Sequence, residues 1–253
     1  MELKIAEWNV AKRSEKKLVD RILKKIETVN ADIVILTEVN KNIDYEKLLA
    51  EKGYVSHISD KNYNRIMIAV SKEKEDQVDF RDPYDGKTNE NHPDSLLVIV
   101  KTMKSEPCLK ILGIRNQITG MSNKDKMEQL SNLKIAINKN NPDVIIGDFN
   151  WYSAIIIPHI EEELEKYIEI KQYKMFPRDN KIYSRIGHVR KEIRKSSPDR
   201  VLYREGLVKD KEEPGKNPHY YHQELYDYKP YNNFSEGWPS DHDILVVTVQ
   251  IPD

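Results

Sequence analysis

The sequence predicts a mixed α/β fold, and three observations lead to this prediction. Short apolar runs of strand length recur along the chain, and segments with apolar residues at helical spacing separate some of them. Elsewhere one strand candidate follows another directly, which a purely parallel sheet with its crossover helices does not allow. No repeat, low-complexity tract or Gly/Ser-rich linker divides the 253 residues. A single domain over residues 1–253 is therefore expected.

The expected strands are apolar segments rich in Val, Ile and Leu, several of which begin or end on a polar residue. In chain order they lie at 3–10, 33–36, 66–70, 96–100, 109–114, 144–146, 201–203 and 244–251.

Three helices are expected between these strands. The first follows Ser14, which can cap it, and its apolar residues from 18 to 29 form one stripe at helical spacing. The second runs from about 122 to 138. The third follows residue 151 and continues to about 168, with Pro158 near its first turn, where proline is tolerated.

The composition suits a globular protein with a hydrophobic core and a charged, hydrated surface, since 38 % of the residues are hydrophobic and 33 % are charged. No apolar run approaches the roughly 20 residues that a membrane span needs. The N-terminal residues lack the apolar core of a signal peptide. Cys108 is the only cysteine, so no internal disulfide can form. We therefore expect a cytoplasmic protein that binds no membrane, and no obligate protein partner is evident.

Charge is less evenly distributed than the net value of −1 suggests. From 171 to 204 there are eleven Lys or Arg against three acids, a local balance of +8. Such a run is either a solvated face or a surface for a phosphate backbone. Two segments, 81–94 and 210–239, read as long loops, and the second is rich in tyrosine and proline. Long loops in compact domains tend to be disordered or functional.

Five short polar motifs lie at the edges of the expected strands. Each alone has a plain explanation, because Asn and Asp at strand ends usually satisfy nearby backbone groups in turns. The motif residues are Asn9, Glu38, Asp148 with Asn150, Asp199, and Asp241 with His242.

Three of these residues carry oxygen donors of the kind that Mg²⁺ prefers. They are the carboxylates of Glu38 and Asp241 and the amide oxygen of Asn9. Mg²⁺ is usually held by one or two carboxylates, with waters and substrate phosphate completing its octahedron. The sequence therefore predicts a Mg²⁺ site at these residues, with Mn²⁺ as an alternative ion.

The other four residues supply what phosphodiester hydrolysis requires besides a metal. Asp148 and Asn150 lie two residues apart, so an extended backbone would point both side chains to one side. A carboxylate there can orient the attacking water while an amide donates to a phosphate oxygen. His242 needs a partner that fixes its tautomer, and Asp199 is the expected one.

The order and spacing of the motifs resemble the endonuclease/exonuclease/phosphatase superfamily, which includes exonuclease III, AP endonucleases and DNase I. The resemblance runs from the Trp8-Asn9 strand to Ser240-Asp241-His242, with Gly147-Asp148-Phe149-Asn150 between them. It implies a four-layered α/β/β/α sandwich of two mixed sheets, DNase I-like, with the site at one end. It also implies the roles of the matching residues: Asn9, Glu38 and Asp241 at the metal, Asp148 and Asn150 at the nucleophile, and Asp199 as partner of the phosphate-binding His242.

Two positions depart from the family pattern. Thr37 stands where the family usually has Gln before its metal-binding Glu. Arg115 aligns best with a position where many members carry His and the AP endonucleases carry Tyr. Arginine stays charged at any working pH, so it can clamp a phosphate but cannot act as a general acid. We predict that Arg115 binds phosphate; the alternative is that it is a surface residue.

The substrate predicted from these features is nucleic acid, with DNA ahead of RNA. The basic stretch, which includes Arg185, and the Tyr-rich loop with Trp238 combine cations with stacking aromatics, as in proteins that hold single-stranded or flipped nucleotides. Those tyrosines could equally pack the loop onto the fold. The alternatives are a phosphatase or phosphodiesterase acting on a small phosphorylated molecule or lipid head group, and a non-catalytic binding module on a nuclease scaffold.

Overall fold

The structure is a computed structural model of the whole chain. It describes residues 1–59, 65–86, 92–101, 107–117, 121–150, 158–176, 185–189, 192–196, 199–208, 217–221 and 242–251.

The first sheet brings together strands from both halves of the sequence. Its spatial order is β13-β14-β1-β2-β4-β3, in which β1 pairs parallel to β2 and antiparallel to β14. The parallel pair is joined through helix α1 (Lys16–Val29), since parallel neighbours need a crossover connection. The strands are β1 (Glu2–Asn9), β2 (Ile33–Val39), β3 (Tyr54–Ile58), β4 (Arg65–Ser71), β13 (His219–Tyr221) and β14 (Ile244–Gln250).

The second sheet repeats this plan, with order β5-β6-β7-β8-β12-β9. Here β7 and β8 form the parallel pair, joined through helix α3, and the other neighbours are antiparallel. The strands are β5 (Val78–Arg81), β6 (Asp94–Lys101), β7 (Pro107–Arg115), β8 (Val144–Asp148), β9 (Tyr173–Phe176) and β12 (Asp199–Arg204). Two further strands, β10 (Arg185–Val189) and β11 (Glu192–Ser196), form a separate antiparallel ribbon.

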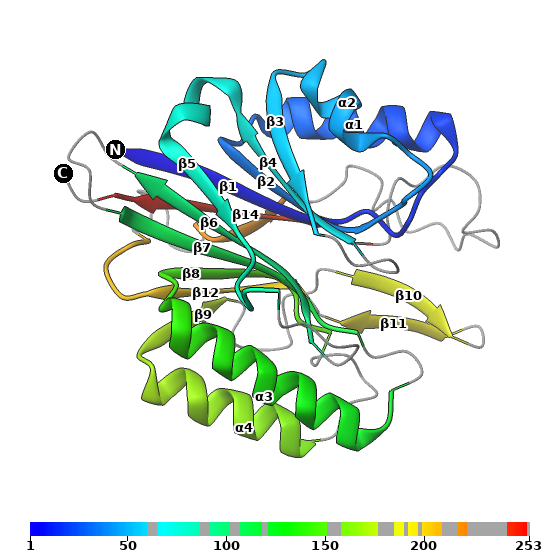
Figure 1. Cartoon of the computed structure of the whole chain (residues 1–253). Coiled ribbons are helices and arrows are strands. Elements are labelled where there is room, and N and C mark those ends of the chain that lie inside the picture. The colour runs from blue at the N-terminus through cyan, green and yellow to red at the C-terminus, as the bar shows by residue number, and fades with distance from the viewer. Residues whose placement is uncertain are drawn as a thin grey trace.

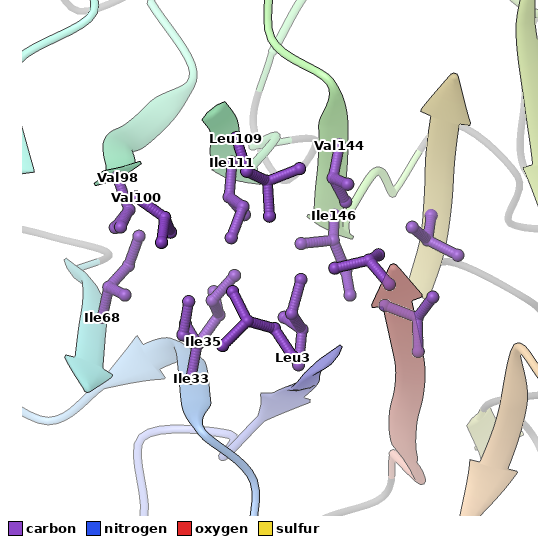
Figure 2. Packing of buried hydrophobic residues seen from close by; sticks show 14 of the residues in the cluster. Leu3, Ile33, Ile35, Ile68, Val98, Val100, Leu109, Ile111, Val144 and Ile146 are labelled. Carbon is purple, nitrogen blue, oxygen red and sulfur yellow. The ribbon is translucent and has the colours of Figure 1, made fainter. Parts of the chain in front are cut away.

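Alternation of side chains along the strands divides the apolar residues between three layers. In β2, Ile33 and Ile35 point between the sheets, where they join an aliphatic cluster drawn in Figure 2. Val34 and Leu36 point the opposite way, into a second cluster. Because both faces of β2 are buried, its sequence is a continuous apolar run rather than an alternating one.

Helices cover the outer face of each sheet (Figure 1). Helices α1 (Lys16–Val29) and α2 (Tyr45–Ala50) pack on the first sheet, and α3 (Asn123–Asn140) and α4 (Pro158–Ile170) pack on the second. A short 3-10 helix, η1 (Lys72–Gln77), joins the two sheets in the chain. The layers thus run helix, sheet, sheet, helix, which confirms the four-layered α/β/β/α prediction.

Several details differ from the sequence predictions. The N-cap of α1 is Glu15 rather than Ser14, and its side chain makes no capping hydrogen bond, so the Ser14 prediction is wrong. Strand β13 lies inside the segment predicted as a loop at 210–239, because its backbone pairs with β14. Within the described part of the chain, no helix combines the length and apolarity needed to cross a membrane.

Candidate active site

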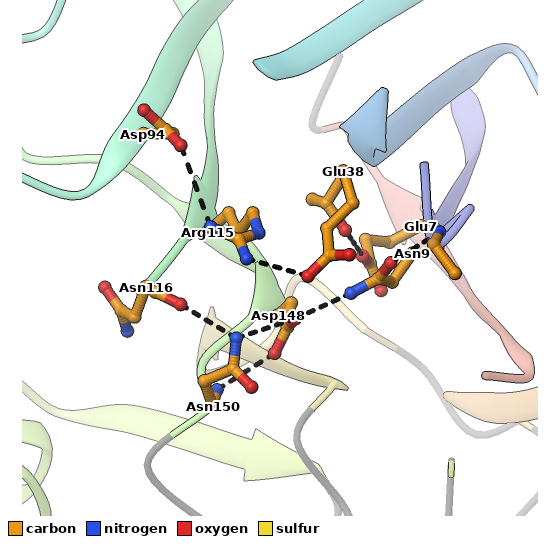
Figure 3. A network of polar contacts seen from close by, with 10 residues as sticks. Glu7, Asn9, Glu38, Asp94, Arg115, Asn116, Asp148 and Asn150 are labelled. Atoms are coloured by element: carbon orange, nitrogen blue, oxygen red, sulfur yellow. Dashed lines mark hydrogen bonds and ion pairs between the residues drawn. The ribbon is translucent and has the colours of Figure 1, made fainter. Parts of the chain in front are cut away.

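The inner faces of the two sheets change from aliphatic to polar at one end of the sandwich. In β1 the inward positions run Leu3, Ile5, Glu7, Asn9, and in β8 they run from Val144 through Ile146 to Asp148. The same change occurs in four other strands, toward Thr37 in β2, Asp94 in β6, Arg115 in β7 and Asp199 in β12. Each of these residues lies an even number of positions from the core residues of its strand, so it is on the same, inward face. The polar end is therefore a continuation of the core, and Figure 3 shows part of it.

Glu38 reaches this polar end because its strand is irregular. It lies out of phase with Ile33 and Ile35, but the pairing of β2 with β4 shifts register between Leu36 and Val39. Glu38 itself has φ 56, a left-handed conformation that is uncommon for a residue other than glycine. A bulge of this kind re-aims a side chain and is common next to active sites. The strand irregularity thus turns Glu38 toward Arg115 (Figure 3).

The Asp148 carboxylate is held by two amide side chains (Figure 3). Its Oδ2 accepts from Nδ2 of Asn9 and from Nδ2 of Asn150, each at 2.8 Å. Its Oδ1 accepts from the backbone N–H of Asn150 at 3.0 Å. Asn150 has φ 52, so the two side chains meet through a tight turn and not through the extended backbone that we predicted. The turn places Asn150 as a support of Asp148.

Burial gives Asp148 the acid–base behaviour of a group that can accept a proton near neutral pH. Loss of solvation raises the pKa of Asp148 to about 7, and the negative charge of Asp199 acts in the same direction. The charges of His242 and Arg115 oppose this rise. A pKa near the working pH is what general-base catalysis favours.

His242 and Asp199 form the predicted pair. Nδ1 of His242 lies 2.8 Å from Oδ2 of Asp199, and both side chains are buried. The backbone carbonyl of His242 accepts a hydrogen bond from Nε1 of Trp8 at 2.9 Å. With Asp199 ionised, Nδ1 carries the proton that faces it, and Nε2 is the ring nitrogen that can donate to a phosphate oxygen when the imidazole is protonated. The Asp199 contact thus fixes the orientation of the ring.

Arg115 is a buried residue of the network and not a surface residue. Its Nη2 donates to Oε1 of Glu38 at 2.7 Å, and its Nη1 lies 3.9 Å from Oδ2 of Asp94. Burial alone would raise the pKa of Glu38, but the charge and hydrogen bond of Arg115 outweigh it and leave the pKa below its ordinary value. The alternative of a surface position is therefore wrong, while phosphate binding by Arg115 stays a prediction.

The sequence analysis missed Glu7, a fully buried acid of the same end. Its Oε1 accepts from the hydroxyl of Thr37 at 3.3 Å, and its Oε2 has no hydrogen-bond partner among the described residues. Burial raises the pKa of Glu7 well above its ordinary value, and the negative charges of Asp199 and Asp148 add to the rise. Thr37, which departs from the family pattern, thus contacts Glu7, a buried acid with a raised pKa.

Two more residues of the site were missed. Asp94 faces Arg115 across the β6–β7 pair. Asn116 accepts through its backbone carbonyl from Nδ2 of Asn150 at 2.8 Å and donates from its own Nδ2 to the carbonyl of Phe149 at 2.9 Å. Asn116 directly follows β7, a strand that ends in the site, which was the available signal. Asp94 is the first residue of β6, although it lay in the segment predicted as a loop at 81–94.

The donor groups that the described residues bring together fit a hard divalent cation. The Glu38 side chain is 23 % exposed, and Oδ1 of Asn9, an amide oxygen, accepts the N–H of Ala11 at 2.9 Å. Carboxylate and amide oxygens are the ligands that Mg²⁺ prefers. No group of three or more His, Cys, Asp or Glu suited to a metal occurs among the described residues.

Three predicted residues are not placed by this geometry. Asp241, predicted as a metal ligand, and Trp238, predicted to bind substrate, lie outside the described residues. Arg185 begins β10, and only its backbone is described. The roles of these three residues stay predictions.

Comparison with known structures shows the same fold in several solved proteins. The AP endonuclease LMAP from Leishmania major has a TM-score of 0.66 at 12% identity, covering 99% of this chain and 88% of that one. The 3' phosphatase NExo from Neisseria, bound to a product DNA hairpin, has a TM-score of 0.63 at 14% identity, with 99% of both chains covered. TDP2 of D. rerio, complexed with a single-strand DNA product, has a TM-score of 0.59 at 17% identity, covering 98% and 99%.

Sequence comparison places the chain in a family. A search of curated proteins found no significant match. Residues 6–242, however, match the Endonuclease/Exonuclease/phosphatase family. The matched stretch contains the polar end of the sandwich from Glu7 to His242, and the solved structures above share its fold. The chain therefore belongs to the endonuclease/exonuclease/phosphatase family, whose members are phosphoesterases that generally depend on divalent metal ions.

Proposed function

We propose that the protein is a Mg²⁺-dependent nuclease that hydrolyses phosphodiester bonds, in DNA ahead of RNA. The observation that carries this proposal is the Asp148 carboxylate, buried, held by Asn9 and Asn150, and raised in pKa to about 7. A group so fixed can orient a water molecule and take its proton while the oxygen attacks phosphorus.

Each remaining residue has a task in this reaction. His242, held by Asp199, is placed to stabilise the negative charge that grows on the phosphate oxygens. Arg115 adds a permanent positive charge, and because it does not release its proton, the leaving oxygen takes a proton from solvent. Asn9, Glu38 and the predicted Asp241 would hold Mg²⁺, which when bound supplies charge neutralisation at the phosphate.

Exposed cations around the site support a polyanionic substrate. Lys12 and Lys16 are exposed on the segment that follows Asn9, and Lys41 is exposed on the segment that follows Glu38. Lys12 is close enough to lower the pKa of Glu38 through its charge. Cations beside a phosphodiesterase site suit a substrate with several phosphates. The DNA products bound to NExo and TDP2 support the same choice of substrate.

A substrate panel with metal controls tests the proposal. Supercoiled plasmid, single-stranded DNA, RNA and a set of phosphorylated small molecules are each incubated with the protein in Mg²⁺, Mn²⁺ or EDTA. Cleavage of nucleic acid is expected with Mg²⁺, and none with EDTA. Glu38→Gln is expected to abolish cleavage at ordinary Mg²⁺ while the melting temperature changes little.

Three results would contradict the proposal in separate ways. Hydrolysis of the small molecules alone would replace the nuclease by a phosphatase. Cleavage that continues in EDTA, or in Glu38→Gln at the wild-type rate, would remove the metal site. Binding of DNA without hydrolysis of any substrate would indicate a binding module on a nuclease scaffold.

A further inference from the structure

Arg115 lies between two acids but forms a close contact with only one of them. Its guanidinium is 2.7 Å from Glu38 and 3.9 Å from Asp94. Figure 3 marks both contacts with dashed lines. Nε and Nη1 of Arg115 are buried and have no hydrogen-bond partner among the described residues. Burying guanidinium donors without acceptors costs free energy, so a further contact from Nε or Nη1 to an acceptor would stabilise Arg115.

Asp94 is positioned to accept such a contact from Arg115. It is the register partner of Arg115 across β6 and β7, and both residues share the inward face of the sheet. Directly opposite positions on one face bring side chains within reach of each other. The Asp94 side chain is 9 % exposed, so its charge acts on Arg115 through little water. A small rotation of the guanidinium would bring Nη1 into hydrogen-bond contact with it.

Two positively charged groups, Arg115 and a divalent cation, would bind the carboxylate of Glu38. Arg115 neutralises it in the structure, while under the proposed function the same carboxylate holds a divalent cation. Two cations at one carboxylate repel each other, and burial leaves that repulsion weakly screened. Arg115 and the metal ion therefore cannot both bind Glu38 at full strength.

We infer that Asp94 is a positioning residue for Arg115: it takes over the guanidinium when a divalent cation engages Glu38. The inference rests on the proposed metal role of Glu38. Arg115 then acts as an internal competitor of the metal ion, and Asp94 reduces the competition by offering a second acidic partner. Once released from Glu38, Arg115 stays anchored at the site with Nη2 free for a phosphate oxygen.

Calorimetric titration with MnCl₂, without substrate, tests the inference on the full chain. Arg115→Gln removes the competitor, so Mn²⁺ should bind tighter by about tenfold, within the usual range for coupled sites. Asp94→Asn removes the second partner, so Mn²⁺ should bind more weakly by a similar factor. In the Arg115→Gln background the effect of Asp94→Asn should shrink, because no guanidinium remains to be moved. Asp79→Asn breaks the exposed Arg81–Asp79 pair on neighbouring β5 and should leave Mn²⁺ affinity unchanged.

A second variant and a direct observation keep the test decisive. If Arg115→Gln fails to fold, Arg115→Met serves, since it keeps an unbranched side chain but removes the competing charge, and tighter Mn²⁺ binding is again expected. Crystals of the wild type grown with Mn²⁺ should show Arg115 in contact with Asp94 and apart from Glu38.

The outcomes separate this inference from the proposed function. If Mn²⁺ binding is lost in Glu38→Gln but is unchanged or weaker in folded Arg115→Gln, the competition is wrong and the metal site stands. If Glu38→Gln binds Mn²⁺ as the wild type does, the metal role of Glu38 and the inference both fall. An equal effect of Asp94→Asn with and without Arg115 would remove Asp94 as its positioning residue.

Discussion

Glu7 is an ionisable group buried between two other acids, which gives it a measurable effect on stability. Its pKa is raised well above the ordinary value of 4.5, chiefly by burial. Between the ordinary pKa, which applies to the unfolded chain, and the raised pKa of Glu7 in the folded protein, the folded protein binds a proton that the unfolded chain has released. Stability is therefore greatest at low pH with respect to this group, and it falls as the pH rises through that window.

Glu7→Gln should remove this dependence on pH. Glutamine keeps the oxygen that accepts from Thr37 and is neutral at every pH. The wild type should lose up to about 1.4 kcal/mol per pH unit more than the variant as the pH rises. Urea unfolding in EDTA between about pH 5 and pH 8 measures this difference. Equal slopes for the two proteins would show that Glu7 is ionised alike in the folded and unfolded states.

Asp148 is expected to act in the transition state rather than in substrate binding. Asp148→Asn should lower kcat by about 10² or more, with little change in KM. Asp143→Asn is a matched control at the start of the same strand segment, where the carboxylate accepts from the N–H of Lys110 at 2.8 Å, an acceptor role that asparagine can keep. Steady-state kinetics on the best substrate decide the question. A rise in KM alone would move Asp148 to substrate binding.

Sequence alone could identify some of these residues and not others, for a local reason. A lone acid in an alternating strand reads as solvent-facing, so Glu7 was missed, whereas Asp94 was missed because it lay in the segment predicted as a loop at 81–94. The phase of Glu7 with Leu3 and Ile5 was the only available sign that it points inward. Glu38 was predicted from its motif, although its phase points outward, because a strand irregularity cannot be read from the residues that form it.

Strand β8 positions Asp148 through a contact that only glycine allows. Gly147 has φ +155, and a Cβ on it would lie 1.9 Å from the carbonyl oxygen of Ile114 in β7. Because this neighbour is backbone, it cannot move aside without disturbing the parallel β7–β8 pair. The glycine therefore sets the spacing of the two strands that end in Arg115 and Asp148.

Gly147→Ala should destabilise the protein by about 3 kcal/mol or more and reduce activity in the molecules that stay folded. Gly206→Ala is the control: its φ is +86, but nothing lies within 4 Å of the added Cβ. It should show only the left-handed penalty, roughly 1–2 kcal/mol, with unchanged activity per folded molecule. Denaturant unfolding and kinetics on both variants test the pair. Equal destabilisation would mean that the close strand contact relaxes freely.

The sequence analysis missed the two strands of the β10–β11 ribbon and every edge strand of the two large sheets. The edges of the two six-stranded sheets are β13 and β3 in one and β5 and β9 in the other, and none of the four was predicted. Central strands such as β8 bury both faces and read as apolar runs, whereas edge strands are short and carry polar residues. The four missed edge strands are therefore elements whose identity depends on a neighbouring strand and not on their own residues.

At the scale of the molecule, the β10–β11 ribbon stands apart from both sheets but close to the site. Only residues 197 and 198 separate β11 from Asp199. The ribbon and its flanks belong to the basic stretch of the sequence. We expect this ribbon to contact the nucleic-acid backbone outside the cleaved bond.

Replacing Arg185, Arg190 and Arg194 together by Ala should weaken DNA binding and flatten its dependence on salt. Lys72→Ala with Lys101→Ala is the control, since both lysines are exposed and lie at the ends of β4 and β6 that are opposite to the site. Binding is measured at several salt concentrations in EDTA, which prevents cleavage. If the salt dependence of DNA binding is unchanged in the triple variant, the ribbon cations are only solvated surface charges, and a small substrate is favoured.

The pairing of β1 with β14 has a consequence for how the protein is made. On the ribosome β1 emerges early, but its second edge stays open until residues 244–250 follow. Such distant pairings make folding slow, and an open strand edge invites association with other chains. His242 arrives on the same late segment. A nascent chain therefore holds Glu38 and Asp148 before it holds His242, so the candidate site is completed only late in synthesis, together with the last strand.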